Sequence, residues 1–489
     1  MNHPLRLALL SSVLLTSCMV GPRFEPPVPI EPDAFRGAEN TEESFADLAW
    51  FEVFRDPALQ ALVRTALRNN YDVRIAAERV IEARARYTII NSGRYPDVDA
   101  FGVQQWDRVP RDRAPSGVGR NSQLTSIGLG LSWDLDFWGR YASASDAARA
   151  ELLATEFARV AVLQSLVTDL ALAYFELLEL DSELAIAQDT LGSRSKSVEL
   201  VSARLKEGVA NKVELRQAQQ LVLIAASLVP ILEQAIERQE NYIRLLVGDL
   251  PGPVQRADLS RYSENRIEIP AGLPSQVLAR RPDIQVAELK LIAANARIGE
   301  AKALLYPSVS LTASGGAASQ QLDDLLRPGS GTWSLVPSIS LPIFNAGRLN
   351  ANVEVTESLQ RQAALQYLAT LQRAFREVAD ALIGHTKSHE ARQLIQITEE
   401  TLADQVRLSR MRYRGGVTAY FEVLDSEREH FDSELALAQA IRDELTSTVR
   451  LYRALGGGWQ GTSELAAKGV QEVPVLNETP ESNEAQTDT

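Results

Sequence analysis

The chain has few of the residues on which most enzymes and metal sites depend. Its 489 residues include one cysteine, four histidines and three methionines. A single cysteine excludes a disulfide within the chain, and so few histidines leave little material for acid–base or metal chemistry. There is no Gly-x4-Gly-Lys-Ser/Thr phosphate loop, and Gly128-x-Gly130 is followed by Trp133 where a dinucleotide fingerprint needs glycine. We therefore expect no enzyme and no cofactor.

Basic charge is also in short supply. Lysine and arginine number 50 against 64 aspartates and glutamates, which gives a formal net charge of −14. A nucleic-acid-binding protein would need a basic surface, so this balance argues against a nucleic-acid partner. The hydrophobic and charged fractions, 45% and 23%, are ordinary for a folded chain.

The two nearest histidines do not make a convincing metal site. His385 and His389 are four residues apart, a spacing that can bind zinc on a helix. The glutamate of the metalloprotease motif is missing between them. We expect a solvated helix face there and no metal site.

The N-terminal apolar stretch is too short to span a bilayer. Arg6 precedes the stretch Leu7–Leu15, and the segment ends in Leu15-Thr16-Ser17-Cys18. This ending resembles a bacterial lipobox, which predicts a signal peptide over residues 1–17 and a diacylglycerol and an acyl chain, such as palmitate, on Cys18. Met19 follows in place of aspartate, which by resemblance to sorted lipoproteins favours the outer membrane.

Both ends of the chain look unlike the middle. Five prolines between residues 19 and 35 predict an extended tether, within a lipidated N-terminal and equatorial segment over 18–56. Residues 461–489 are polar and acidic, and we predict a disordered tail.

The body of the chain is an internal duplication. The segment Asp72–Pro96 matches Asp283–Pro307 at an offset of 211 residues. A second block matches at an offset of 208, with Gly208-Val209 on Gly416-Val417 and Glu214 on Glu422. We therefore predict a first repeat over 57–256, a linker over 257–273 and a second repeat over 274–460.

Proline spacing predicts unusually long helices. No proline occurs between Pro115 and Pro230 or between Pro342 and Pro474. Within these gaps we predict long helices and shorter returns: Arg140–Glu207, Val209–Val247, Arg348–Arg414 and Val417–Leu455. Each long helix would extend about 100 Å. Two further helices are expected over Pro57–Tyr95 and Pro274–Tyr306, each able to stack end to end with a return helix beside a long one.

Four segments alternate between apolar and polar residues with the period of a β-strand. They lie at Asp97–Trp106, Ile127–Phe137, Ser308–Ser314 and Trp333–Ile343, the last interrupted by Pro337. Each has about the length of a tilted transmembrane strand. Loops are predicted over Pro110–Gly119 and Gln320–Gly331. Four strands cannot close a membrane barrel, so several chains would have to share one; a soluble sheet stays an alternative.

Several motifs carry a resemblance to a known family over residues 18 to 460. They are Cys18 with Val20-Gly21-Pro22, Trp50-Phe51 before Asp56-Pro57, Arg281-Pro282-Asp283-Ile284, Tyr306-Pro307, Leu341-Pro342-Ile343-Phe344 with Gly347-Arg348, and Tyr413-Arg414-Gly415-Gly416 with Val423-Leu424-Asp425. The chain resembles the outer membrane factors, the TolC-like and OprM-like export ducts, and among them the NodT-type lipoproteins. The resemblance implies a mixed α and β membrane protein: a homotrimer with four strands per chain in a 12-stranded barrel, continued by a helical coiled-coil tunnel in the periplasm.

The resemblance also implies partners. An outer membrane factor is a passive duct that works with a periplasmic adaptor, or membrane fusion protein, and an inner-membrane efflux pump, most often of the resistance–nodulation–division class. Drugs, metal ions, oligosaccharides and proteins all stay open as cargo. A coiled-coil scaffold lipoprotein without a pore is the alternative to a duct.

The predicted functional residues lie where the helices turn. Glu422 and Asp425 match the acidic pair that rings the closed aperture in the family, with glutamate in place of aspartate at 422. Glu214 is the repeat equivalent of Glu422, and Arg204 and Arg412 are candidates for ion pairs that hold the closed state. Solvated carboxylates and ordinary surface ion pairs are the alternatives.

The turns themselves are predicted to meet the adaptor. They contain Gly208, Val209, Gly415, Gly416 and Val417. Glycine ends helices for conformational reasons alone, and that explanation is compatible with docking.

Overall fold

The computed structural model describes residues 19–27, 35, 44–108, 110, 121–262, 277 and 280–458. The predicted signal peptide, Cys18 and the predicted tail lie outside these residues, as do most of the predicted tether, of the linker and of the loop after Pro110. The chain divides into two compact units. The first comprises Met1–Val28, Arg79–Glu156 and Val286–Ala369, and the second Pro29–Glu78, Phe157–Gln285 and Thr370–Thr489.

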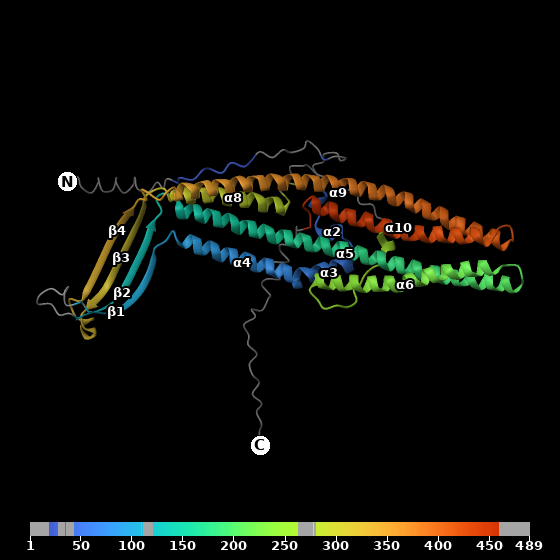
Figure 1. Cartoon of the computed structure of the whole chain (residues 1–489), viewed down its shortest axis with the longest axis horizontal. Coiled ribbons are helices and arrows are strands. Elements are labelled where there is room, and N and C mark those ends of the chain that lie inside the picture. Colours follow the sequence, from blue (N-terminus) through green and yellow to red (C-terminus); the bar gives the residue numbers. More distant parts are fainter. Residues whose placement is uncertain are drawn as a thin grey trace, which may run out of the picture. The chain divides into compact units, whose positions relative to one another are not determined.

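The first unit contains one antiparallel sheet with the strand order β1-β2-β3-β4 (Figure 1). Its strands are β1 (Asp97–Arg108), β2 (Asn121–Leu135), β3 (Ser308–Ser319) and β4 (Gly331–Ser340). All four predicted strands are therefore present, and β4 runs through Pro337, which lies opposite Leu311 of β3. The short 3₁₀ helix η3 (Leu322–Asp324) lies in the predicted loop between β3 and β4.

The register sorts the side chains of the sheet into two chemically different faces. Residues directly opposite each other on neighbouring strands point to the same face. One such row across all four strands is apolar: Val98, Leu131, Ala313 and Leu335. The neighbouring row, on the other face, is polar or without a side chain: Asp99, Gly130, Ser314 and Ser334. Neither face is covered on β4, which is exposed along its whole length.

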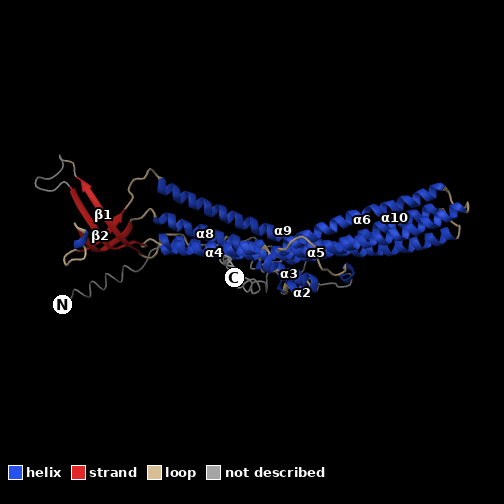
Figure 2. Ribbon diagram, turned by 90° about the horizontal axis from the view of Figure 1, so that it is seen from below, coloured by secondary structure: helices blue, strands red, loops and turns tan. Residues whose placement is uncertain are grey.

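A long helix follows each pair of strands in the chain, and each long helix forms a hairpin with a shorter helix in the second unit. The helices are α3 (Pro57–Asn69), α4 (Tyr71–Ser92), α5 (Arg140–Lys206), α6 (Lys212–Val247), α8 (Pro282–Ala303), α9 (Arg348–Arg414) and α10 (Tyr420–Ala454). The short elements η1 (Phe45–Asp47), α2 (Trp50–Val53) and η2 (Leu259–Tyr262) complete the described chain. In the second unit, the hairpins α5–α6 and α9–α10 lie side by side (Figures 1 and 2). The prediction for α9 is confirmed at both ends, and that for α5 differs by one residue.

The predicted helix Pro57–Tyr95 is wrong in one respect, because it is broken at Asn70. Asn70 is non-helical, with ψ of 130°. Its side-chain oxygen accepts from the Val73 amide at 3.1 Å, and its side-chain nitrogen donates to the Leu246 carbonyl at 2.9 Å. The side chain thus caps α4 and binds the end of α6, which stabilises the break.

The second repeat has the same break at the equivalent position. Arg281 lies outside the helix, just before Pro282, and proline disfavours a helical residue in front of it. Arg281 donates to the carbonyl of Ala454 at the end of α10, at 3.2 Å. In both repeats, therefore, the return helix ends where the shorter helix begins, which confirms the predicted end-to-end stacking.

A buried core holds the second unit together around Asp56. Trp50, Tyr174 and Tyr452 are among its fully buried side chains. The Asp56 carboxylate accepts hydrogen bonds from the hydroxyls of Tyr174 and Tyr262, at 2.6 and 2.7 Å, and from the Ala58 amide at 2.8 Å. The Asp56-Pro57 motif is therefore a helix start whose cap also bonds to two core tyrosines.

Candidate functional site

Both helical hairpins of the second unit end in turns of the same form. Gly208 and Gly416 have φ of 76° and 72°, the left-handed region that only glycine adopts without strain. The amides of Val209 and Val417 donate back to the carbonyls of Arg204 and Arg412, at 2.9 and 3.0 Å. These bonds satisfy carbonyls at the helix ends. Both valines are exposed at the turns.

The two return helices begin differently. The Asn211 side-chain oxygen accepts from the amides of Val213 and Glu214, so α6 has a side-chain cap. The equivalent residue of α10, Ala419, has none. The Thr418 hydroxyl instead donates to the Glu422 carboxylate. A residue predicted to form the gate therefore also holds the turn of the second repeat.

The predicted acids are partly exposed, and each has a partner of its own. Glu422 pairs with Arg412 at 3.0 Å, and Asp425 pairs with Arg428 at 2.7 Å. Glu214 accepts from the side-chain nitrogen of Asn211 at 3.0 Å. The pair Arg412–Glu422 is thus formed within one chain, while its role in gating stays a prediction.

Arg204 does not pair with the predicted acids in the described residues. Its guanidinium carbon lies 4.4 Å from the centre of the Tyr413 ring, and it donates to the Tyr413 carbonyl at 3.2 Å. Since Arg204 belongs to α5 and Tyr413 to α9, these contacts connect the two hairpins. The Tyr413 ring packs in turn on Tyr420, with ring centres 5.1 Å apart.

A small apolar cluster holds the ends of the two hairpins together. Its buried members come from all four helices: Val201, Ala218, Tyr413, Tyr420, Val423 and Leu424. Burial and the nearby Glu427 carboxylate raise the pKa of the Tyr420 hydroxyl above its usual value. Glu422 and Asp425 therefore flank two buried residues of this cluster, Val423 and Leu424.

Sequence reasoning missed a buried carboxylate on α10, two residues beyond the predicted gate residue Asp425. The Glu427 side chain is 4% exposed and pairs with Arg410 at 2.8 Å. Arg410 also donates to the Ser193 hydroxyl at 2.9 Å, and Arg194 lies with its guanidinium 4.7 Å from the centre of the Phe431 ring. Burial lowers the pKa of Arg194, against the opposing effect of Glu427. This network connects α5, α9 and α10.

The repeat pattern contained a signal for this network. At the offset of 208 residues, Glu427 corresponds to Gln219 and Arg410 to Ser202. A charge pair that appears in one repeat and not in the other is specific to that hairpin. This comparison marks Glu427 and Arg410 as specific to the second hairpin, together with neighbouring charged residues such as Asp425 and Arg428.

The expectation that His385 and His389 lie on a solvated face is wrong. Nδ1 of His389 lies 2.6 Å from the Glu444 carboxylate, which also binds Arg392, and the ring is only 19% exposed. His385 lies beside the hydroxyls of Ser447 and Thr448. Both rings pack in the contact between α9 and α10.

A sheet with one apolar and one polar face, joined to helices far longer than those of globular domains, has the features of an outer-membrane channel subunit. The family model for outer membrane efflux proteins matches residues 62–249 and 273–457. The cation efflux system protein CusC of Escherichia coli O6:H1 is 36% identical over 456 residues, 92% of this chain and 97% of that protein. The solvent efflux pump outer membrane protein SrpC of Pseudomonas putida is 39% identical over 419 residues, 83% of this chain and 87% of that protein.

Solved structures agree with these sequence matches. The open-state MtrE outer membrane channel of Neisseria gonorrhoeae superimposes with a TM-score of 0.82 and 30% identity, over 90% of this chain and 99% of that one. The chain therefore belongs to the outer membrane efflux protein family. This confirms the predicted family, the mixed α and β fold class and the location in the outer membrane. The similar proteins are efflux proteins, not enzymes.

Proposed function

We propose that three copies of this chain form a passive export duct through the outer membrane, closed at its periplasmic end by a ring of carboxylates. The observation that carries the proposal is the sheet of the first unit. Its apolar face suits lipid and its polar face suits a wet lumen. In the described chain β1 and β4 pair on one side only, and a membrane sheet cannot leave such edges unpaired. Neighbouring copies supply the missing pairs.

The number of copies follows from strand arithmetic together with the resemblance. Closed membrane barrels of this kind have an even number of strands, from about eight upward. Two, three or four copies of a four-stranded sheet would all satisfy that rule. The resemblance to the trimeric outer membrane factors selects three copies and twelve strands.

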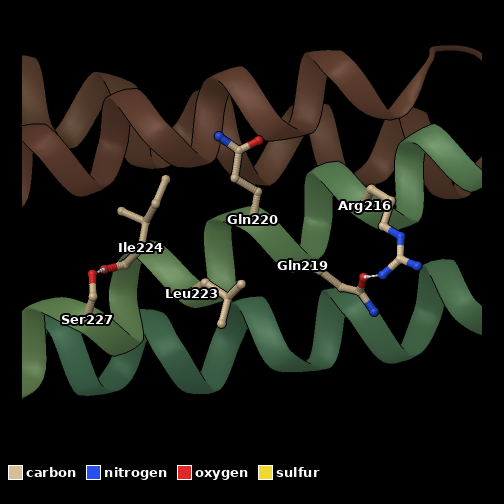
Figure 3. A pocket seen from close by; sticks show the side chains of 6 residues that line it. All are labelled: Arg216, Gln219, Gln220, Leu223, Ile224 and Ser227. Atoms are coloured by element: carbon tan, nitrogen blue, oxygen red, sulfur yellow. Dashed lines mark hydrogen bonds between the residues drawn. The ribbon is translucent and has the colours of Figure 1, made fainter.

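A stripe of three exposed apolar residues on α6, Leu223, Ile224 and Ile231, lies in an otherwise largely polar surface and supports packing against a second copy. A shallow hollow runs along one side of this helix, lined by Arg216, Gln219, Gln220, Leu223, Ile224 and Ser227 (Figure 3). The spacing of three and four residues is that of a coiled-coil seam. Leu223 and Ile224 are exposed in the single chain, as is Ile231 two turns further on. A neighbouring helix laid along this stripe would cover them.

The gate is assigned to Glu422 and Asp425. A three-fold axis would bring six carboxylates from three chains toward one ring. Like charges at close range repel, and such a ring attracts cations. The pairs Arg412–Glu422 and Asp425–Arg428 partly neutralise this charge within each chain, so their release would favour opening.

The proposed partners supply what the chain lacks. An inner-membrane pump provides the energy, and the resistance–nodulation–division class is the first candidate. A periplasmic adaptor contacts the exposed turns at Val209 and Val417. A lipid on Cys18 anchors the chain in the outer membrane. Relatives are named for cation and for solvent efflux, so cargo selection is assigned to the pump.

Single-channel conductance in planar bilayers tests the duct and its gate. We compare the wild type with the double variant Glu422→Ala and Asp425→Ala. The control is Glu400→Ala, which removes an exposed carboxylate of α9. We expect a small, cation-preferring conductance that rises in the double variant and not in the control.

Two other outcomes would contradict parts of the proposal. An equal conductance in all three proteins would keep the duct and place the gate at other residues. Folded trimers without any conductance would favour the scaffold without a pore. Folded protein that is not trimeric and does not conduct would favour it as well.

A further inference from the structure

Three side chains with metal-ligand chemistry meet between α9 and α10, away from the turn acids. Nε2 of His430 lies 3.0 Å from a Glu399 oxygen, and Nδ1 lies 3.5 Å from a Glu434 oxygen. One ligand atom from each of the three residues lies within 4.8 Å of the others. The side chains of His430, Glu399 and Glu434 are 22%, 21% and 30% exposed, so water reaches them without surrounding them.

The charge around this cluster is short of cations. Two carboxylates face one imidazole, and Asp189 on α5 adds further repulsion at Glu434. The nearby Arg194 lies over the Phe431 ring and donates to the carbonyls of Leu221 and Glu427. Arg194 attracts the Glu434 carboxylate through space, but the described residues show no ion pair between the two.

The cluster is specific to the second repeat. At the offset of 208 residues, Glu399, His430 and Glu434 correspond to Leu191, Val222 and Ala226. The first hairpin has apolar residues at all three positions. The backbone of the hairpin therefore does not require a polar set here.

We propose that Glu399, His430 and Glu434 bind one divalent transition-metal ion of the Zn²⁺ class in each chain. One imidazole nitrogen with two carboxylate oxygens is a ligand set that zinc accepts, with water in the fourth position. Ligand atoms of a tetrahedral zinc are about 3.3 Å apart, given bond lengths of about 2.0 Å. In the structure the two carboxylates lie at different nitrogens of the His430 ring, so binding of one ion requires the ring to turn until one nitrogen faces both. The ion then links α9 to α10 behind the gate.

The second histidine–glutamate contact of the same helices shows the difference. Glu444 approaches His389 at 2.6 Å, yet its other oxygen binds Arg392. An arginine in that position supplies the positive charge that a metal ion would bring. His389 is therefore a matched control for His430, on the same pair of helices and similarly buried.

Zinc titration of full-length protein in detergent, with any affinity tag removed and metals stripped by chelation, tests the site. We expect one zinc ion per chain, measured by calorimetry. Glu434→Gln and His430→Gln should each weaken binding at least tenfold, and His389→Gln should leave it unchanged. Trimer size measured by chromatography shows that each variant is folded.

A spectroscopic variant identifies the ligand directly. In His430→Cys, a thiolate replaces the imidazole, and bound Co²⁺ should acquire a sulfur-to-cobalt charge-transfer band that the wild type lacks. No zinc binding by the wild type, equal binding by His430→Gln, or no such band in the cysteine variant would each overturn the proposal. His430 would then be an imidazole between two carboxylates and no more. These readouts do not depend on conductance, so they stand apart from the proposed duct.

Discussion

Replacing Glu427 with alanine tests whether its buried network stabilises the packing of α9 against α10. The substitution removes the carboxylate that binds Arg410 at 2.8 Å and leaves that guanidinium with the Ser193 hydroxyl. The carboxylate also contributes a weaker contact with the Ser197 hydroxyl, at 3.5 Å. The substitution keeps the hydrogen bond from Arg194 to the backbone carbonyl of residue 427, but it removes the attraction between the carboxylate and that guanidinium.

The size of the effect follows from the exposure of the two partners. Breaking a fully buried ion pair costs about 3–5 kcal/mol. Glu427 is 4% exposed but Arg410 is 37% exposed, so solvent compensates Arg410 in part. The second Glu427 oxygen has no hydrogen-bond partner among the described residues, which further lowers what the carboxylate contributes. We therefore expect a loss of about 1–2 kcal/mol in local stability.

Hydrogen exchange followed by mass spectrometry on trimers in detergent measures this loss. A local destabilisation of about 1–2 kcal/mol corresponds to exchange about 5 to 30 times faster. The faster exchange should be confined to peptides covering the ends of α9 and α10. Glu400→Ala, which removes an exposed carboxylate from α9, should change exchange little.

Two results would refute this reasoning. Exchange in the α9–α10 peptides that matches the wild type would show that the ion pair contributes nothing to the hairpin. Faster exchange throughout the second unit would show that Glu427 supports the fold as a whole and not the hairpin.

Three further changes should affect stability in defined ways, each measured by thermal unfolding of trimers. Gly248→Ala should cost roughly 2–3 kcal/mol, because φ is 80° and the new Cβ would lie 2.7 Å from the Asn69 carbonyl oxygen; no shift in the melting temperature would contradict this. Asn70→Ala should cost about 1–2 kcal/mol by removing the α4 cap and the bond to α6, and a neutral result would show that the break is set elsewhere. Burial raises the pKa of Glu179 from 4.5 to about 7 against the opposing effect of Arg442, so the folded state holds a proton that the unfolded chain has lost in this window. Stability should therefore fall by up to about 3 kcal/mol as pH rises from about 4.5 to 7, and Glu179→Gln should flatten this slope; an unchanged slope would contradict it.

The sequence predicted the elements of the fold well because each is marked by a pattern within its own segment that continues over many residues. The proline gap predicted one long helical stretch, the glycines after Arg414 marked the observed end of α9, and alternation located all four strands. The break at Asn70 was missed because no proline or glycine marks it. Its cause is a side chain that binds the end of α6, some 176 residues away in sequence. Such a contact exists only once the helices have packed.

The candidate site was predicted less completely, for the same reason. The sequence suggested Arg412 as an ion-pair partner for the acids near the turns, and the structure pairs it with Glu422. It also suggested an acidic partner for Arg204, which instead lies over Tyr413 of the other hairpin. Glu427 was overlooked because a charged residue on a helix is usually solvated, and only packing from α5 and α9 buries it.

The duplication offers a way to separate function from folding in this chain. Both hairpins have the same glycine turn and the same end-to-end stacking, so these features belong to the fold. The charged residues that follow the turn do not repeat, since Asp425 and Glu427 correspond to Gln217 and Gln219 in the first repeat. The first hairpin carries an exposed apolar stripe on α6 instead. An apolar stripe suits a fixed contact with a neighbour. Partly solvated ion pairs contribute little free energy, so they can break and form with other partners. We therefore expect conductance to respond to substitutions in α9–α10, and trimer assembly to respond to substitutions along α6.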